Sequence, residues 1–174
     1  MRIFLMLALA ALLAACSPDQ NWRDIGFEGT ALKAQLPCKP DRTTREVPLG
    51  GVPVQLTVAG CESGEAMLAV MTAPLAPGAD VQAVLAGWQQ ATLAHLQTTA
   101  PEEDRPWVRA GLLPLHAARQ MRVRGQTGDG RAVWTHAVWG AFAEGDHVRV
   151  VHAVVHAPKA RDELAQTLFE GVQP

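Results

Sequence analysis

The chain has 174 residues, of which 48% are hydrophobic and 18% are charged, and its formal net charge at pH 7 is −2. This charge is too small for a nucleic-acid-binding protein, which presents a strongly basic face. The apolar content also excludes a disordered or low-complexity chain, because it is sufficient for one domain with its own core.

The first residues are typical of an export signal. Met1 and Arg2 give a short positive start, and the 13 residues from Ile3 to Ala15 are all apolar. A helix needs about 20 apolar residues to cross a bilayer. The run therefore predicts a secretory signal over residues 1–15 that is removed from the mature protein.

The end of this run carries a more specific motif. Leu13-Ala14-Ala15-Cys16 resembles the lipobox of bacterial lipoprotein signal peptides. The resemblance implies cleavage before Cys16 and acylation of that cysteine, and several acyl chains make a stable membrane anchor. The alternative is ordinary cleavage after an A-x-A-like site, which leaves Cys16 as a stray thiol. In such lipoproteins an aspartate after the cysteine implies retention in the inner membrane, so Ser17 favours the outer membrane, with the protein on its periplasmic face.

Cleavage at this point removes the single charge of Arg2, so the mature chain carries a net charge of −3. Residues 16–26 are predicted to be the lipid anchor and a polar tether, and residues 27–174 a single α+β domain. Cys38 and Cys61 are the two cysteines of that domain. An even pair in an oxidising compartment predicts a disulfide, because a reactive or metal-binding pair needs closer, CxxC-like spacing. Closure of this loop is expected to stabilise the fold by roughly 3 kcal/mol.

The first half of the domain is predicted to form sheet. Residues 30–36 and 52–58 alternate apolar and polar side chains, as half-buried strands do. Gly50-Gly51 marks a turn, so residues 43–49 are expected to be the hairpin partner of residues 52–58. Residues 66–72 are apolar nearly throughout, which predicts a central strand covered on both faces.

A helix is predicted next. Asp80 is a good N-cap, and apolar residues from Val81 to Leu96 recur at helical spacing up to an end near Thr98. Residues 99–107 are polar and predict a loop. Three more strands are expected, over residues 115–124, 131–142 and 147–156, followed by a closing helix whose first turn contains Pro158. Two strand groups separated by a helix and followed by another predict an antiparallel sheet packed by two helices.

This order of elements resembles the PsbP-like α/β sandwich, which is shared by the extrinsic photosystem protein of that name and by many bacterial envelope lipoproteins. Leu36-Pro37-Cys38-Lys39-Pro40 is similar to the strand end near the start of such domains. The segment from Ala117 to Gly125, with the turn at Gly130, resembles their central hairpin. The resemblance implies a non-catalytic binding or assembly module, and it transfers no active-site residue.

Histidines are the most prominent candidates for a metal site. His136, His147, His152 and His156 lie in the last two predicted strands, while His95 and His116 lie elsewhere. His152 and His156 share a strand face but stand about 13 Å apart, which is too far to hold one metal ion together. A two-residue turn would pair His136 with Ala153 and direct it to the opposite face. We therefore expect separate histidines that are exposed or hydrogen-bonded, and no metal.

No catalytic motif is complete. Gly60-Cys61-Glu62-Ser63-Gly64 comes nearest to the nucleophile turn G-x-S-x-G, but its serine stands one place too late. The chain has no P-loop, no dinucleotide fingerprint and no H-E-x-x-H motif, so no cofactor is expected. Five arginines of the C-terminal strands (Arg119, Arg122, Arg124, Arg131 and Arg149) form either a binding cluster for an acidic group or a solvated sheet face.

The sequence thus predicts a non-enzymatic envelope lipoprotein that is held to the membrane by its lipid and binds another envelope protein. The alternative is a lipoprotein that binds a small molecule or a metal through the histidine-bearing C-terminal hairpin.

Overall fold

The computed structural model describes residues 20–49 and 51–174. Its elements follow in the order β1 (Arg23–Gly26), β2 (Lys33–Leu36), β3 (Asp41–Leu49), β4 (Val52–Ser63), β5 (Ala66–Pro74), α2 (Val81–His95), β6 (Glu103–Pro106), β7 (Arg119–Gln126), β8 (Ala132–Glu144), β9 (His147–Ala157) and α3 (Asp162–Glu170). The predicted signal segment and Cys16 lie outside the described residues.

The strands form one large sheet and one small one. The large sheet has the strand order β3-β4-β5-β9-β8-β7-β6, and every neighbouring pair is antiparallel. Strands β1 and β2 form a separate antiparallel pair. In the part of the chain that the structure describes, two helices pack on this framework, so the predicted α+β class with an antiparallel sheet and two helices is confirmed.

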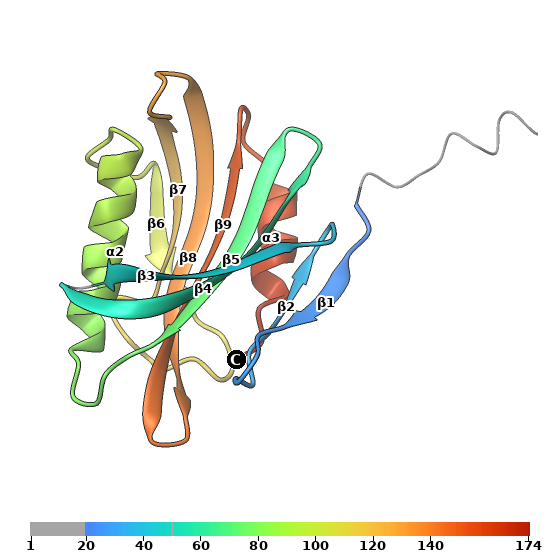
Figure 1. Cartoon of the computed structure of the whole chain (residues 1–174). Helices are drawn as coiled ribbons and strands as arrows, with labels where there is room; N and C mark the ends of the chain where they lie inside the picture. Colours follow the sequence, from blue (N-terminus) through green and yellow to red (C-terminus); the bar gives the residue numbers. More distant parts are fainter. Residues whose placement is uncertain (1–19, 50) are drawn as a thin grey trace, which may run out of the picture.

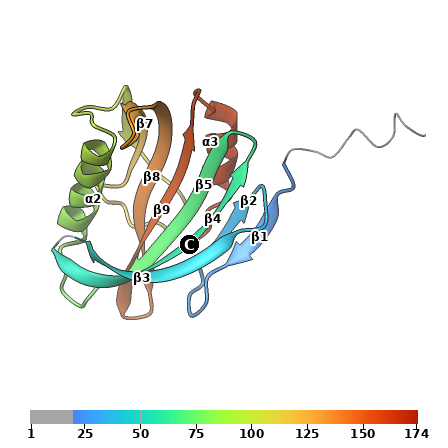
Figure 2. The same ribbon diagram turned by 45° about the horizontal axis from the view of Figure 1, so that its top comes forward.

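The large sheet is covered on both faces. Helix α2 lies on one face, and α3 lies on the other together with the β1–β2 pair (Figures 1 and 2). Strand β9 contributes apolar side chains to both faces. Val151 and Val155 belong to the core under α3, whereas Val150 and Val154 belong to the core under α2. Because successive side chains of a strand point to opposite faces, a strand between two cores must be apolar at nearly every position.

Strand β5 follows the same rule. Leu68 and Val70 enter the core under α3, and Ala69 and Ala73 enter the core under α2. The prediction of a central strand covered on both faces is therefore confirmed. The predicted hairpin is confirmed as well, since β3 and β4 pair with Leu49 opposite Val52.

Helix α2 begins where its cap predicts. The side chain of Asp80 accepts a hydrogen bond from the backbone N–H of Ala83 at 3.1 Å, and the helix ends at a cap on Leu96. Helix α3 begins later than predicted: Pro158 lies in the connection after β9, and the N-cap is Arg161. The first turn forms only where the carbonyl of Arg161 accepts from the N–H of Ala165 at 2.9 Å.

Two short strands were not predicted. Residues 23–26, expected in the tether, form β1, because Ile25 is buried opposite Ala34 of β2. Residues 103–106, expected in a polar loop, form β6, an edge strand held by backbone pairing to β7. All four side chains of β6 are exposed, so its sequence carries no alternation that indicates a strand.

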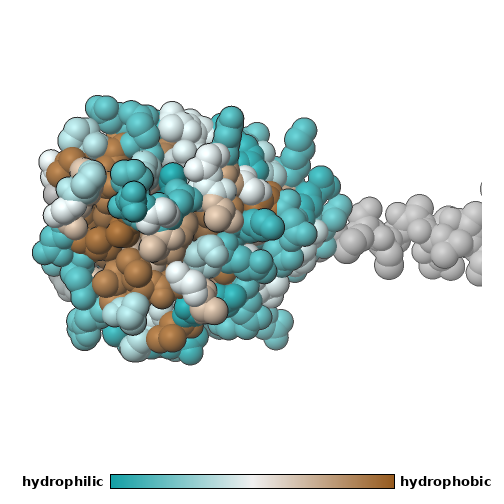
Figure 3. Space-filling view, turned by 90° about the horizontal axis from the view of Figure 1, so that it is seen from below, coloured by the Kyte–Doolittle hydropathy of each residue, from teal (hydrophilic) through white to brown (hydrophobic). Residues whose placement is uncertain are grey.

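The end of the molecule at the bottom of Figure 1 is rich in apolar side chains. The loop between β6 and β7 lies there beside the C-terminus, and Figure 3, which views this end directly, shows apolar residues gathered on it. Val108 in that loop is 86% exposed. Exposed apolar patches of this kind are typical of contact surfaces.

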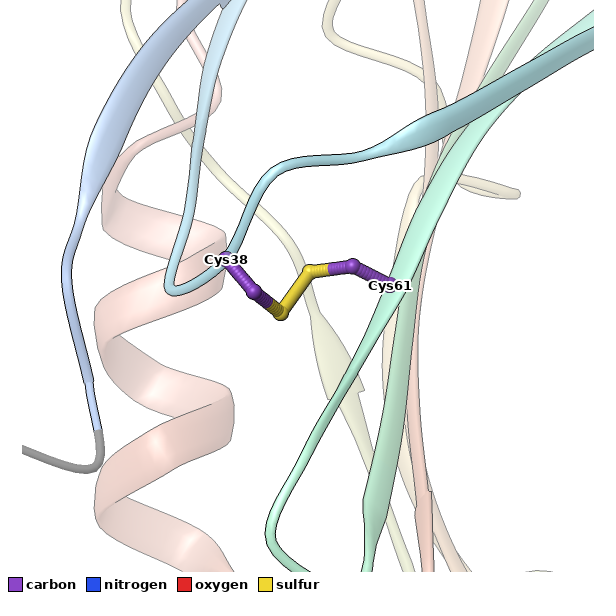
Figure 4. The surroundings of a disulfide bond; sticks show 2 residues. All are labelled: Cys38 and Cys61. Atoms are coloured by element: carbon purple, nitrogen blue, oxygen red, sulfur yellow. A yellow bond between two sulfur atoms is a disulfide. The ribbon is translucent and has the colours of Figure 1, made fainter.

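Cys38 and Cys61 form the predicted disulfide. It joins the segment after β2 to the last residues of β4, with 6.0 Å between the two Cα atoms (Figure 4). The bond thereby ties the small β1–β2 sheet to the large sheet. None of the helices in the described part of the chain is long and apolar enough to pass through a membrane.

Candidate functional site

A groove runs between α3 and the strands at the β6 edge of the large sheet. Its volume is about 480 Å³, within the range of about 300–1,000 Å³ that small-molecule sites occupy. We call it the α3 groove; its lining residues are Glu103, Arg105, Gln120, Met121, Arg122, His136, Asp162, Glu163, Ala165, Gln166 and Thr167. Charged and polar side chains line the groove together with Met121 and Ala165, so the groove suits a ligand with both polar and apolar parts.

Strand register brings the groove residues together. Arg122 of β7 stands opposite Glu103 of β6 on one side and His136 of β8 on the other. Residues directly opposite each other in an antiparallel pair share a face. Glu103, Arg122 and His136 therefore form one row across three strands, and Asp162 of α3 closes the row from above.

Arg122 is the centre of the row. Its guanidinium lies 2.6 Å from a carboxylate oxygen of Glu103 and 3.3 Å from one of Asp162, and it lies over the ring of Trp134, 5.7 Å from the ring centroid. Because it pairs with carboxylates from both walls, Arg122 ties β6 and α3 to β7. Its Nε atom is buried and has no hydrogen-bond partner among the described residues.

His136 forms the floor of the groove and is 6% exposed. Its Nε2 accepts a hydrogen bond from the backbone N–H of Arg161 at 3.2 Å, while Nδ1 lies 3.7 Å from Asp162. Burial lowers the pKa of His136, the nearby Asp162 opposes that shift, and Arg122 adds to it. His136 is therefore neutral at pH 7 and helps to fix the start of α3.

The groove holds charges of both signs but no evident catalytic pair. The hydroxyl of Thr167 donates to the backbone carbonyl of Glu163 at 2.9 Å, and His136 already uses Nε2 to accept from the backbone. Neither group is arranged as a nucleophile with a free base beside it. Among residues 20–49 and 51–174, no group of three or more His, Cys, Asp or Glu is placed to hold a metal ion.

His152 and His156 lie on the face of the sheet opposite to His136. His136 pairs with Val155, not with Ala153 as predicted, because the two-residue turn joins Glu144 directly to His147. The predicted face of His136 is confirmed, because a difference of two residues in the strand register leaves the direction of the side chain unchanged. His136 and His152 thus lie on opposite faces of the sheet.

His152 is buried in an aromatic cluster under α2. Its ring stacks on Trp139 with centroids 4.7 Å apart and meets Trp88 edge-on at 4.9 Å. Nδ1 lies 2.9 Å from the backbone carbonyl of Val138, which accepts its hydrogen. Burial lowers the pKa of His152 to about 4, so the ring is neutral at pH 7 and acts as part of the core.

The five C-terminal arginines do not form one cluster. Arg122 and Arg124 share a face and both lie over Trp134. The other three pair separately: Arg119 with Asp104 at 2.7 Å, Arg131 with Asp129 at 2.7 Å, and Arg149 with Glu144 at 2.8 Å. Burial acts to raise the pKa of Glu144, but the hydrogen bonds from Thr30, Arg149 and the backbone N–H of Ala31 together lower it.

Sequence reasoning singled out His136 and Arg122 but missed their acidic partners. Glu103 fell in a segment predicted as a loop, and Asp162 fell in the first turn of a helix expected to begin earlier. Acidic residues are favoured in the first turn of a helix by the helix dipole, and this preference could have indicated Asp162 and Glu163.

No protein-family model matches the chain, and no curated protein matches it significantly.

Proposed function

We propose that this protein is an envelope lipoprotein, anchored through an acylated Cys16 to the periplasmic face of the outer membrane, that serves as a non-catalytic binding or assembly module. The lipobox-like Leu13-Ala14-Ala15-Cys16 supports the anchor, and Ser17 supports the outer membrane. The Cys38–Cys61 disulfide agrees with export to an oxidising compartment.

The α3 groove is the proposed binding site. The observation that carries this proposal is the row of Glu103, Arg122, His136 and Asp162 along a groove of about 480 Å³. The row is held in place by strand register and ion pairs, so it is ready to bind without rearrangement. The side chains present are arranged for recognition of charge, not for bond breaking, which supports a binding role.

We also propose that the domain is a PsbP-like sandwich. The support is the Leu36–Pro40 segment, the β7–β8 hairpin and an antiparallel sheet covered by helices. In that family the fold serves binding and assembly, which agrees with the role proposed for the groove.

A second candidate is the binding of a small polar molecule in the same groove. The volume of the groove favours it, and His136 belongs to the C-terminal hairpin named in the sequence alternative. Metal binding by the histidines of this hairpin is not supported, because His136 and His152 lie on opposite faces of the sheet.

The test is site-specific photo-crosslinking in intact cells. A photoreactive amino acid replaces Gln166 on the groove wall, and a matched variant carries it at Glu46, an exposed residue of β3 far along the sheet. A binding module gives one dominant crosslinked envelope protein from position 166 and none from position 46. Identical weak products from both positions would contradict a role for the groove in protein binding and would leave the small-molecule candidate.

A further inference from the structure

The fold begins only a few residues after the proposed anchor. The backbone N–H of Asn21 donates to the carbonyl of Pro37 at 2.8 Å, and Trp22 packs against the core under α3. Cys16 precedes Asn21 by five residues, and a fully extended chain spans about 3.3–3.6 Å per residue. An acylated Cys16 therefore holds Asn21 within about 18 Å of its lipid.

The anchored end of the domain lies at the first turn of α3. Gln20 shares a surface hollow with Arg161, Asp162 and Glu163. Asp162 and Glu163 also line the α3 groove, on the other side of the same helical turn. A short connection from the lipid thus brings this turn and the mouth of the groove close to the membrane surface.

The balance of positive and negative side chains on this surface indicates which lipid headgroups it can bind. Lys159 and Arg161 are matched by Asp162 and Glu163, and all four residues are exposed. Anionic lipids are bound by clusters of about four to eight Lys and Arg, which this surface does not have. A balanced surface instead matches a zwitterionic headgroup, in which a primary ammonium donates to carboxylates while the phosphate pairs with a guanidinium.

We infer that the surface around the first turn of α3 lies against the bilayer that holds the anchor, where the carboxylates at the groove mouth bind the ammonium of zwitterionic phospholipid headgroups. This inference rests on the proposed acylation of Cys16. The apolar loop between β6 and β7 lies at the other end of the domain, where Gly111 packs beside the C-terminal Pro174, and it points away from that bilayer.

The test uses the full mature protein in vesicles of phosphatidylethanolamine and phosphatidylglycerol that contain a lipid with a spin-labelled headgroup. A fluorescent unnatural amino acid replaces Lys159 beside α3, and the matched control carries it at Val108 in the apolar loop. Fluorescence at position 159 should be quenched severalfold more than at position 108. Equal quenching, or stronger quenching at position 108, would overturn the inference.

Two further arms separate the possible failures. Mass spectrometry of the same sample reports acylation: an unmodified Cys16 would refute the proposed anchor, whereas an acylated protein without quenching at position 159 would refute only the orientation. Phosphatidylcholine, whose ammonium has no N–H to donate, replaces phosphatidylethanolamine in the second arm. Quenching at position 159 should then fall, and it should fall likewise for Glu163→Gln but not for the control Glu46→Gln; unchanged quenching would overturn the role of the carboxylates.

Discussion

His152 shows how a single titratable side chain constrains this fold. It is 3% exposed and lies between Trp88 and Trp139, with one ring nitrogen bonded to the carbonyl of Val138. A charged imidazole at this position would lose its hydration without gaining a carboxylate. The neutral form of His152 is therefore stable in the core under α2, and the protonated form is not.

The free energy of unfolding should consequently fall in mild acid. Burial lowers the pKa of His152 to about 4 in the folded protein, against an ordinary value of 6.5, and the pKa of His156 is also lowered to about 4, by burial and by the neighbouring His95. Below pH 6.5 the unfolded chain takes up protons that the folded protein excludes. Each residue then removes up to about 1.4 kcal/mol of stability per pH unit between pH 6.5 and 4.

Urea unfolding at pH 7 and pH 5 measures this effect. The variant His152→Phe keeps an aromatic ring between the two tryptophans but has no proton to gain, so its stability should depend less steeply on pH than that of the parent. Parallel pH profiles for the two proteins would show that His152 does not limit stability in acid.

The strands that the sequence predicts best are those with one buried and one exposed face, or with both faces buried. β3 and β4 were found from their alternation and their glycine turn, and β5 from its continuous apolar run. β1 was missed because it has four residues and one buried side chain, Ile25, which is too little for a period. β6 was missed because all four of its side chains are exposed and it is held by backbone pairing. Periodicity arises from side-chain burial, so a strand with exposed side chains leaves no trace in it.

The contact between β7 and the end of α2 gives a prediction at this scale. A Cβ atom added at Gly125 would lie 2.4 Å from the backbone oxygen of Leu96, which already accepts from the N–H of Gln126 at 2.9 Å. Gly125→Ala should therefore force the two elements apart and lower the free energy of unfolding by about 1–3 kcal/mol. Gly128→Ala is the matched control, since a Cβ atom there meets nothing within 4 Å; thermal unfolding should distinguish the two variants, and equal melting temperatures would contradict the close contact.

At the scale of the whole molecule, the disulfide was predictable and the groove was not. If Cys16 is set aside as the predicted lipid anchor, Cys38 and Cys61 have one possible partner each, so their pairing can be predicted by counting. The groove instead joins Glu103, Arg122, His136 and Asp162, which come from three strands and a helix. Their proximity depends on the strand order and on where α3 begins, and local sequence patterns report neither.

Removal of the disulfide should lower the stability of the whole domain. It closes a loop over a sequence separation of 23 residues and joins the small sheet to the large one. Replacement of both cysteines by serine should cost about 3 kcal/mol in the chain-entropy model, which lowers the melting temperature of a domain of this size by about 6–12 °C. A melting temperature within a degree of the parent would mean that the small sheet docks equally well without the bond.

Cleavage before Cys16 is the proposal on which the membrane anchor and the orientation of the groove both depend. The most direct measurement is the mass of the N-terminal peptide of protein purified from the membrane fraction of the cell. We expect a peptide that begins at Cys16 and carries acyl chains on that residue, and we expect Cys16→Ala to release the protein from the membrane. A mature N-terminus elsewhere, or an unmodified Cys16, would contradict it.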